Sequence, residues 1–121
     1  MADDTPLDRF RGALTGAARA IAREPELDVL WTADAPTLSG QTLRVPMPGR
    51  TLSLAAATEA RGAADGFALR LAHHNAALHQ RHMPAEPVAR ACYDAVEQVR
   101  YEALGARDYA CLLYTSDAAD E

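Results

Sequence analysis

Apolar residues recur at helical spacing near the start of the chain, within TPLDRFRGALTGAARAIARE at residues 5–24. Thr5 suits the N-cap, Pro6 suits the first helical position, and Asp8 lies near the positive end of the helix dipole. Pro25 marks the end of this predicted helix. One face of the helix is apolar: Leu7, Phe10, Leu14, Ala17 and Ile21.

Two later stretches show the same spacing. The first begins at Ser53, a suitable N-cap, and runs to about His74. Its apolar face comprises Ala60, Ala63, Phe67 and Leu71. The second follows Pro84 and Pro87 and runs to about Gly105, a residue that suits a C-cap. We expect the apolar stripe of this third helix to be buried: Cys92, Ala95, Val96, Val99 and Ala103.

Two shorter segments, residues 27–33 and 42–48, are rich in β-forming residues and partly alternate between apolar and polar positions. The intervening DAPTLSGQ supplies turn residues, so the pattern predicts a small β-hairpin with a long loop. Pro46 and Pro48 predict that the second strand lies at an edge. The fold class is therefore mainly α with a small β-hairpin (α+β), with about three principal helices.

Length and composition narrow the class of protein. A chain of 121 residues forms one domain at most, and Cys92 and Cys111 make no disulfide framework. No apolar run approaches the roughly 18 residues of a membrane span, and the acidic, polar start is unlike a secretory signal. The net charge of −5 argues against a nucleic-acid surface. We therefore expect a cytoplasmic protein that contacts neither membrane nor nucleic acid.

The ending, CLLYTSDAADE at residues 111–121, differs in composition from the helical segment before it. Back-translation gives a DNA sequence similar to a transposon mosaic end followed by the adaptor arm of a sequencing library. We interpret residues 111–121 as a translated adaptor rather than native protein and exclude them from fold reasoning. Residues 1–110 are then the front of a longer protein.

All four histidines lie within ten residues, HHNAALHQRH. Imidazoles at this density can ligate zinc, cobalt or copper. His79 and His82 are three apart and share a helical face, whereas His74 and His79 are five apart and point about 140° from each other on an unbroken helix. Polar residues at a helix end are the simpler interpretation.

Acidic and Arg side chains are spaced for ion pairs on the second and third helices. Arg61 and Asp65 are four apart, and Asp94, Glu97 and Tyr101 lie on one helical face. Such groups are typical of surface or interhelix salt bridges rather than acid/base machinery. No phosphate-binding GxxxxGK motif is present.

Four segments taken in order resemble a known family: REPELDVLW, PTLSGQTLRVP, ARGAADGFALRLAHHNAALHQR and YDAVEQVRYEALGARDYA. Their sharpest parts are RG-x-AD at residues 61–65, ALRLA-x-H at residues 68–74, His79 five residues later, and DAVEQ-x-R-x-EA-x-G-x-R at residues 94–107. Over nearly all of residues 10–110 the chain is similar to the N-terminal region of the CobT-type subunit of aerobic cobaltochelatase.

The resemblance implies a subunit of an ATP-dependent ligase that forms metal–nitrogen bonds. That complex inserts cobalt into hydrogenobyrinic acid a,c-diamide during cobalamin biosynthesis. The implied partners are an AAA+ ATPase subunit and a large corrinoid-binding subunit, and ATP, Mg²⁺ and cobalt belong to the whole complex. The family's metal-adhesion motif lies in a C-terminal domain absent from this sequence, so we expect no catalytic residue and no resident cofactor or metal here.

The matched polar residues are expected to form a buried or interface network between the second and third helices, and not a nucleophile site. They are Arg61, Asp65, His74, His79, Glu97, Arg100 and Glu102. Where the family usually has Cys-His-Asp, this chain has His73, His74 and Asn75. The alternative hypothesis is a small metal-binding or hydrolytic domain that uses His74, His79 and Glu97 as ligands.

Overall fold

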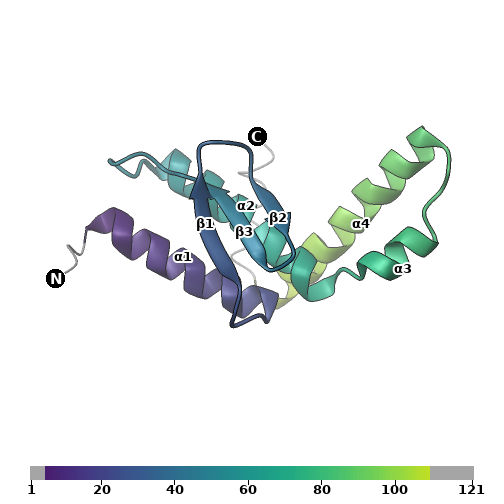
Figure 1. The fold of residues 1–121 in the computed structure, drawn as a ribbon, viewed down its shortest axis with the longest axis horizontal. Coiled ribbons are helices and arrows are strands. Elements are labelled where there is room, and N and C mark those ends of the chain that lie inside the picture. Colours follow the sequence, from purple (N-terminus) through teal and green to yellow (C-terminus); the bar gives the residue numbers. More distant parts are fainter. Residues whose placement is uncertain (1–4, 110–121) are drawn as a thin grey trace.

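Four helices and three short strands make up residues 5–109, the part of the chain that the computed structural model describes (Figure 1). In chain order they are α1 (Pro6–Ala22), β1 (Asp28–Thr32), β2 (Thr37–Ser39), β3 (Thr42–Pro46), α2 (Leu54–His73), α3 (Ala76–Arg81) and α4 (Pro87–Asp108). The predicted fold class, mainly α with a small β element, is confirmed. The predicted tail at 111–121 lies outside the described residues.

Local capping interactions start α1 and α2 where the sequence predicts. The Asp8 backbone N–H donates to Thr5 Oγ1 at 3.1 Å, and the Ala56 N–H donates to Ser53 Oγ at 3.1 Å. Each bond satisfies an N–H that has no partner inside its helix. The first helix ends at Ala22 because Arg23 adopts a left-handed conformation with φ of 60°.

The three strands form one sheet in the order β1-β3-β2, which corrects the predicted hairpin. The two segments expected to pair as a hairpin, β1 and β3, run parallel, and the hairpin is formed by β2 and β3. The chain reverses once after β1 and again at Gly40, which has φ of 59°. Two reversals return β3 to the direction of β1.

The structure also places β3 at the centre of the sheet and not at its edge. Pro46 is tolerated there because it is the last residue of the strand, opposite Thr32 and beyond the reach of β2. The following backbone N–H, that of Met47, donates to the Thr32 carbonyl at 2.9 Å. The missing Pro46 N–H therefore leaves the parallel ladder continuous.

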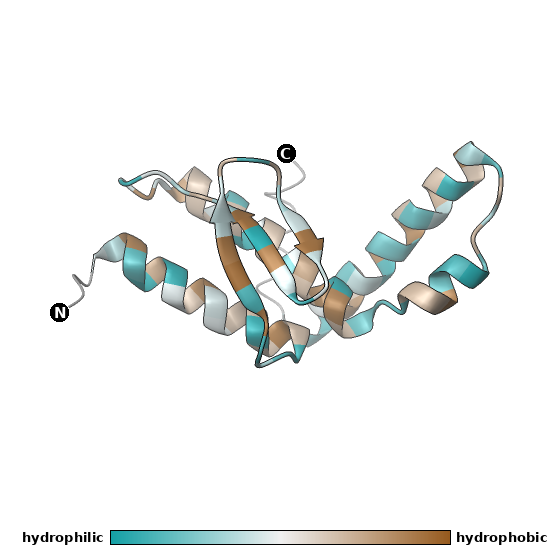
Figure 2. Ribbon diagram, viewed as in Figure 1, coloured by the Kyte–Doolittle hydropathy of each residue, from teal (hydrophilic) through white to brown (hydrophobic). Residues whose placement is uncertain are grey.

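The hydrophobic core lies where α1, α2 and the sheet meet. Leu27, Leu43 and Val45 are its largest fully buried side chains, and Figure 2 shows apolar residues gathered along β1 and β3. Small side chains of α2 face the same core, which lets α1 approach α2 closely: Ala60, Ala64 and Ala68. Most of the predicted apolar face of α1 is confirmed, since Leu14 and Ile21 are buried, but Ala18 is buried where Ala17 was expected.

A close contact between α2 and α4 joins the last helix to this core. Gly105 is buried against the side chain of Leu69. The helix continues past it to Asp108, so the predicted C-cap at Gly105 is wrong. Gly105 instead provides room for the two helices to approach.

The α4 helix contacts the rest of the molecule mainly through its C-terminal half, while its N-terminal half extends outward beside α3 (Figure 1). The stripe predicted to be buried on this helix is exposed along its whole length. Val96 and Val99 expose 68% and 64% of their surface, and Val88 continues the same stripe with 68% exposed. The helix is amphipathic as predicted, but its apolar stripe stays mostly exposed, and Val96 lines a cleft beside Leu78 of α3.

None of the helices between residues 5 and 109 combines the length and apolar character that crossing a membrane requires.

Candidate functional site

A break between α2 and α3 brings two histidines together. His74 ends α2 in an extended conformation, with φ of −96° and ψ of 133°. Asn75 then caps α3, and its side-chain oxygen accepts from the Leu78 backbone N–H at 3.0 Å. Because the helix axis changes direction at this point, the rings of His74 and His79 lie 4.8 Å apart between centroids. The angle of about 140° between the two side chains would hold only on an unbroken helix, and the helix breaks between them.

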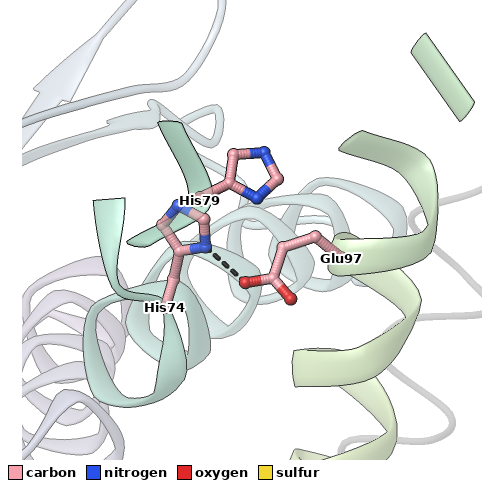
Figure 3. Close-up of side chains that lie close together, drawn as sticks. All are labelled: His74, His79 and Glu97. Atoms are coloured by element: carbon pink, nitrogen blue, oxygen red, sulfur yellow. Dashed lines mark hydrogen bonds and ion pairs between the residues drawn. The ribbon is translucent and has the colours of Figure 1, made fainter. Parts of the chain in front are cut away.

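His74 joins the end of α2 to α4 through Glu97. The Nδ1 atom of His74 lies 2.5 Å from Glu97 Oε2 (Figure 3). An ionised carboxylate only accepts, so Nδ1 carries the proton. Arg100 donates to both Glu97 oxygens, at 2.5 and 3.0 Å, and also to the His73 carbonyl at 2.7 Å. The Arg100 guanidinium thus holds the Glu97 carboxylate in place and satisfies a carbonyl at the C-terminus of α2.

His79 makes a second link, between α3 and α4. Its Nε2 atom lies 2.7 Å from Asp94 Oδ1. The Tyr93 ring stacks on the His79 ring at 4.3 Å between centroids, and the Tyr93 hydroxyl donates to the His79 carbonyl at 3.0 Å. The imidazole is therefore held by a carboxylate at one nitrogen and by an aromatic ring on its face.

The cluster is partly buried between two open clefts. The side chains of His74, His79 and Glu97 expose 8%, 13% and 16% of their surface. One cleft, of about 480 Å³, is lined by His79, Tyr93 and Arg100 among others. The second, of about 380 Å³, is lined by His74 and Asp94 among others. Small solutes can approach the cluster from either side.

Glu97 is ionised in this setting. The hydrogen bond from Arg100 is the main cause that lowers the pKa of Glu97 to about 2, and the hydrogen bond from His74 acts in the same direction. Partial burial opposes both. The carboxylate is therefore available as an acceptor or a ligand across the physiological range.

Arg61 and Asp65 lie elsewhere, on the part of α2 that faces the sheet and the C-terminal half of α4. Arg61 approaches Asp65 Oδ2 at 3.7 Å, but this buried oxygen has no hydrogen-bond donor among the described residues. Burial raises the pKa of Asp65 to about 6, and the Arg61 charge opposes this shift. Asp65 borders a third cleft, of about 390 Å³, which Tyr101 and Glu102 also line.

The seven residues predicted to form one network therefore separate into two groups. His74, His79, Glu97 and Arg100 come together, whereas Asp65 and Glu102 border the other cleft and Arg61 pairs with Asp65. Glu102 accepts from the Gln98 side chain at 3.1 Å. The side chains of His73, His82 and Cys92 take no part in the contacts of His74 and Glu97. His82 and Cys92 are exposed, and His73 is half-buried.

Two residues important to this geometry went unrecognised at the sequence level. Asn75, a departure from the family pattern, is the helix cap that redirects the chain. The signal was present, because Asn is among the residues preferred at helix N-caps. Tyr93 gave no such signal, since its stacking on His79 depends on how α3 folds back on α4.

The fold and the cluster define a class of protein: a small α+β module in which partly buried polar side chains connect three helices. The family model described as Cobalamin biosynthesis protein CobT matches residues 4–112. The chain therefore belongs to the CobT family of cobalamin biosynthesis, as its sequence resemblance predicted. No solved structure matches it.

Proposed function

We propose that this chain is the N-terminal assembly region of a cobaltochelatase subunit. The complex works in the cytoplasm and inserts cobalt into hydrogenobyrinic acid a,c-diamide at the expense of ATP. The observation that carries the proposal is the family match, which extends over residues 4–112.

The exposed stripe of α4 supports an assembly role. Val88, Val96 and Val99 lie on one face of the helix and are each about two-thirds exposed. Contiguous aliphatic surface of this kind is uncommon on a protein that works alone and marks interaction sites. An apolar helix face is well suited to a groove on another protein. The AAA+ ATPase subunit is the proposed occupant, and the large corrinoid-binding subunit joins the same complex.

Division of labour between subunits suits the chemistry. A metal ion must shed water and the macrocycle must distort before insertion, so coupling to a nucleotide-driven conformational cycle is expected. In this scheme ATP and Mg²⁺ are handled by the ATPase subunit. The module described above supplies binding surface and no catalytic group.

Co-purification of the tagged chain with the purified ATPase subunit tests the proposal. We expect the wild-type chain to retain the ATPase, and the double variant Val96→Glu, Val99→Glu to lose it by at least tenfold. Ala91→Glu is a matched control, because Ala91 is an exposed residue of the same helix. Retention of the ATPase by the double variant, or self-association of the chain through α4 with no binding to the ATPase, would contradict the proposal.

The polar groups give a second test of assembly. Alanine at Glu97 or Arg61 is expected to weaken co-purification, since Glu97 anchors α4 to the end of α2 and Arg61 pairs with Asp65, which borders the third cleft. Unchanged binding by both variants would show that neither residue contributes to the interface, directly or by positioning the helices that form it.

A further inference from the structure

We propose that His74, His79 and Glu97 form a binding site for one divalent transition-metal ion of the zinc and cobalt type. One ligand atom from each residue lies within 4.8 Å of the others. Figure 3 shows the His79 ring above the His74 and Glu97 pair, with one ring nitrogen directed toward them. This departs from the expectation, drawn from the resemblance, that the region holds no metal.

The donor set suits such ions. Two imidazole nitrogens and one carboxylate oxygen are the ligands that zinc and cobalt take in three-ligand sites, with a water molecule in the remaining position. Calcium and magnesium prefer oxygen ligands, so this set selects against them. Among the described residues, no other group of three His, Cys, Asp or Glu side chains comes close enough together for metal binding.

Movements of no more than about 1.5 Å convert the present geometry into a metal site, because the three ligand atoms lie within 4.8 Å of one another. Metal–ligand bonds of about 2.0–2.2 Å place neighbouring ligand atoms about 3.3 Å apart in a tetrahedral site. The His74 Nδ1 and Glu97 Oε2 atoms are now 2.5 Å apart, so they must separate by less than about 1 Å. The ion takes the place of the proton that these two atoms share.

Asp94 prepares His79 for this role. Its carboxylate accepts from the His79 Nε2–H, which leaves Nδ1 as the nitrogen with a free lone pair. A carboxylate behind a ligating histidine is the usual means of fixing the tautomer and ring orientation at metal sites. Tyr93 stacks on the ring and restricts it further. Asp94 is therefore a positioning residue, and the ligands are His74, His79 and Glu97.

Arg100 limits the affinity of the site for a metal ion. Its guanidinium donates to both oxygens of Glu97, so a bound ion shares this carboxylate with a second positive charge. Coulomb repulsion between them lowers the affinity below that of a closed four-ligand zinc site. Solvent reaches the cluster from the clefts on both sides, which provides a path for the ion.

Metal binding would cross-link parts of the fold. His74 follows the end of α2, His79 lies on α3 and Glu97 lies on α4, so one ion would hold three helices together. This role is independent of the assembly proposal, since it is measured on the isolated chain. If the chain did not bind the ATPase, the metal proposal would be unaffected. If the chain did not bind metal, the α4 stripe could still bind the ATPase.

Titration of the chelator-treated 121-residue chain with Zn²⁺ or Co²⁺, followed by calorimetry and visible absorption, tests the site. We expect one ion per chain, a Co²⁺ spectrum typical of nitrogen and oxygen ligands, and a rise in the thermal midpoint of roughly 5–10 °C at about hundredfold excess over the dissociation constant. His79→Ala and Glu97→Gln are expected to weaken binding at least a hundredfold, and Asp94→Asn about tenfold.

His82→Ala is the matched control, because His82 is an exposed imidazole of the same segment and lies outside the ligand set. Glu97→Gln is nearly the same size and shape as the wild-type residue, so circular dichroism is expected to show unchanged helix content. Three results would overturn the proposal: no stoichiometric binding to the folded wild-type chain, equal losses in His82→Ala and His79→Ala, or a Co²⁺–thiolate band that places the ion on a cysteine.

Discussion

Gly105 of α4 lies so close to Leu69 of α2 that a β-carbon at position 105 would overlap the methyl groups of the leucine. Both residues are buried, so the leucine side chain has to shift before a larger residue fits at position 105. The contact sets how closely the last helix approaches the core. It thereby also sets the position of Glu97, which lies about two turns before Gly105 on α4, relative to His74.

Gly105→Val is expected to destabilise the protein by about 1–3 kcal/mol, because the added methyl groups overfill a packed interface. Urea unfolding monitored by circular dichroism measures the change. Ala103→Val is the control, since Ala103 is exposed on the same helix and valine there costs only about 0.5 kcal/mol in helix propensity. In a Leu69→Ala background, which opens space, the Gly105→Val cost should shrink. Strict additivity of the two changes would contradict the contact.

Asp65 is expected to make stability fall as pH rises from about 4 to about 6. Burial raises its pKa to about 6 in the folded protein, above the ordinary value of 3.8. Within this window the folded state binds more protons than the unfolded state, so deprotonation favours unfolding. The charged groups near Asp65 are its ion-pair partner Arg61 and three residues that line the same cleft: Glu59, Arg70 and Glu102.

Asp65→Asn removes this titration. We expect the variant to be more stable than the wild type at pH 7 by roughly 1–3 kcal/mol, and the two proteins to converge as pH approaches 4. Thermal unfolding across this pH range measures the difference. Glu59→Gln is a matched control, because Glu59 is an exposed carboxylate of the same helix. Curves for wild type and Asp65→Asn that stay parallel over the whole range would contradict the assignment.

The apolar stripe of α4 is expected to contribute little to the stability of the isolated chain. Val96→Gln and Val99→Gln should each change the free energy of unfolding by no more than about 0.5 kcal/mol, because both side chains are mostly exposed. A core truncation such as Leu43→Ala should cost about 2–5 kcal/mol in the same assay. A loss of similar size for either valine would show that α4 packs differently in solution.

Asn75→Ala should loosen α3 without unfolding the core. The Asn75 side chain caps this short helix, and loss of an N-cap costs about 1 kcal/mol. His79 is then expected to leave the Tyr93 ring, which is measurable as a change in the ring-current shift of the His79 protons by NMR. Asn75→Asp keeps the capping oxygen and serves as the control. Unchanged His79 shifts in Asn75→Ala would mean that contacts with α4 alone position α3.

Much of the local structure could be predicted because it depends on neighbouring residues. Thr5 and Ser53 cap their helices through N–H groups three residues ahead, so a short stretch of sequence contains both partners. Pro87 likewise marks the start of α4. The break at Asn75 could also be predicted in principle, because its cap depends on an N–H only three residues ahead. The spacing of His74 and His79 on one continuous helix does not take this break into account.

The candidate site was only partly predictable. The residue types were identified from spacing and family resemblance, but their grouping was not. Glu97 joins His74, and Asp94 joins His79, across sequence separations of 23 and 15 residues. Such pairings depend on how α3 and α4 fold back on α2, a property that helical periodicity does not contain.

The sequence by itself determined the family, the starts of α1, α2 and α4, and the amphipathic character of α1 and α4. Only the tertiary structure decided that β1 and β3 run parallel, that the apolar face of α4 is left exposed, and that His74, His79 and Glu97 converge. The physical reason is the range of the interactions. Capping and periodicity act within one or two helical turns, whereas strand pairing, helix packing and side-chain clusters depend on segments far apart in the chain.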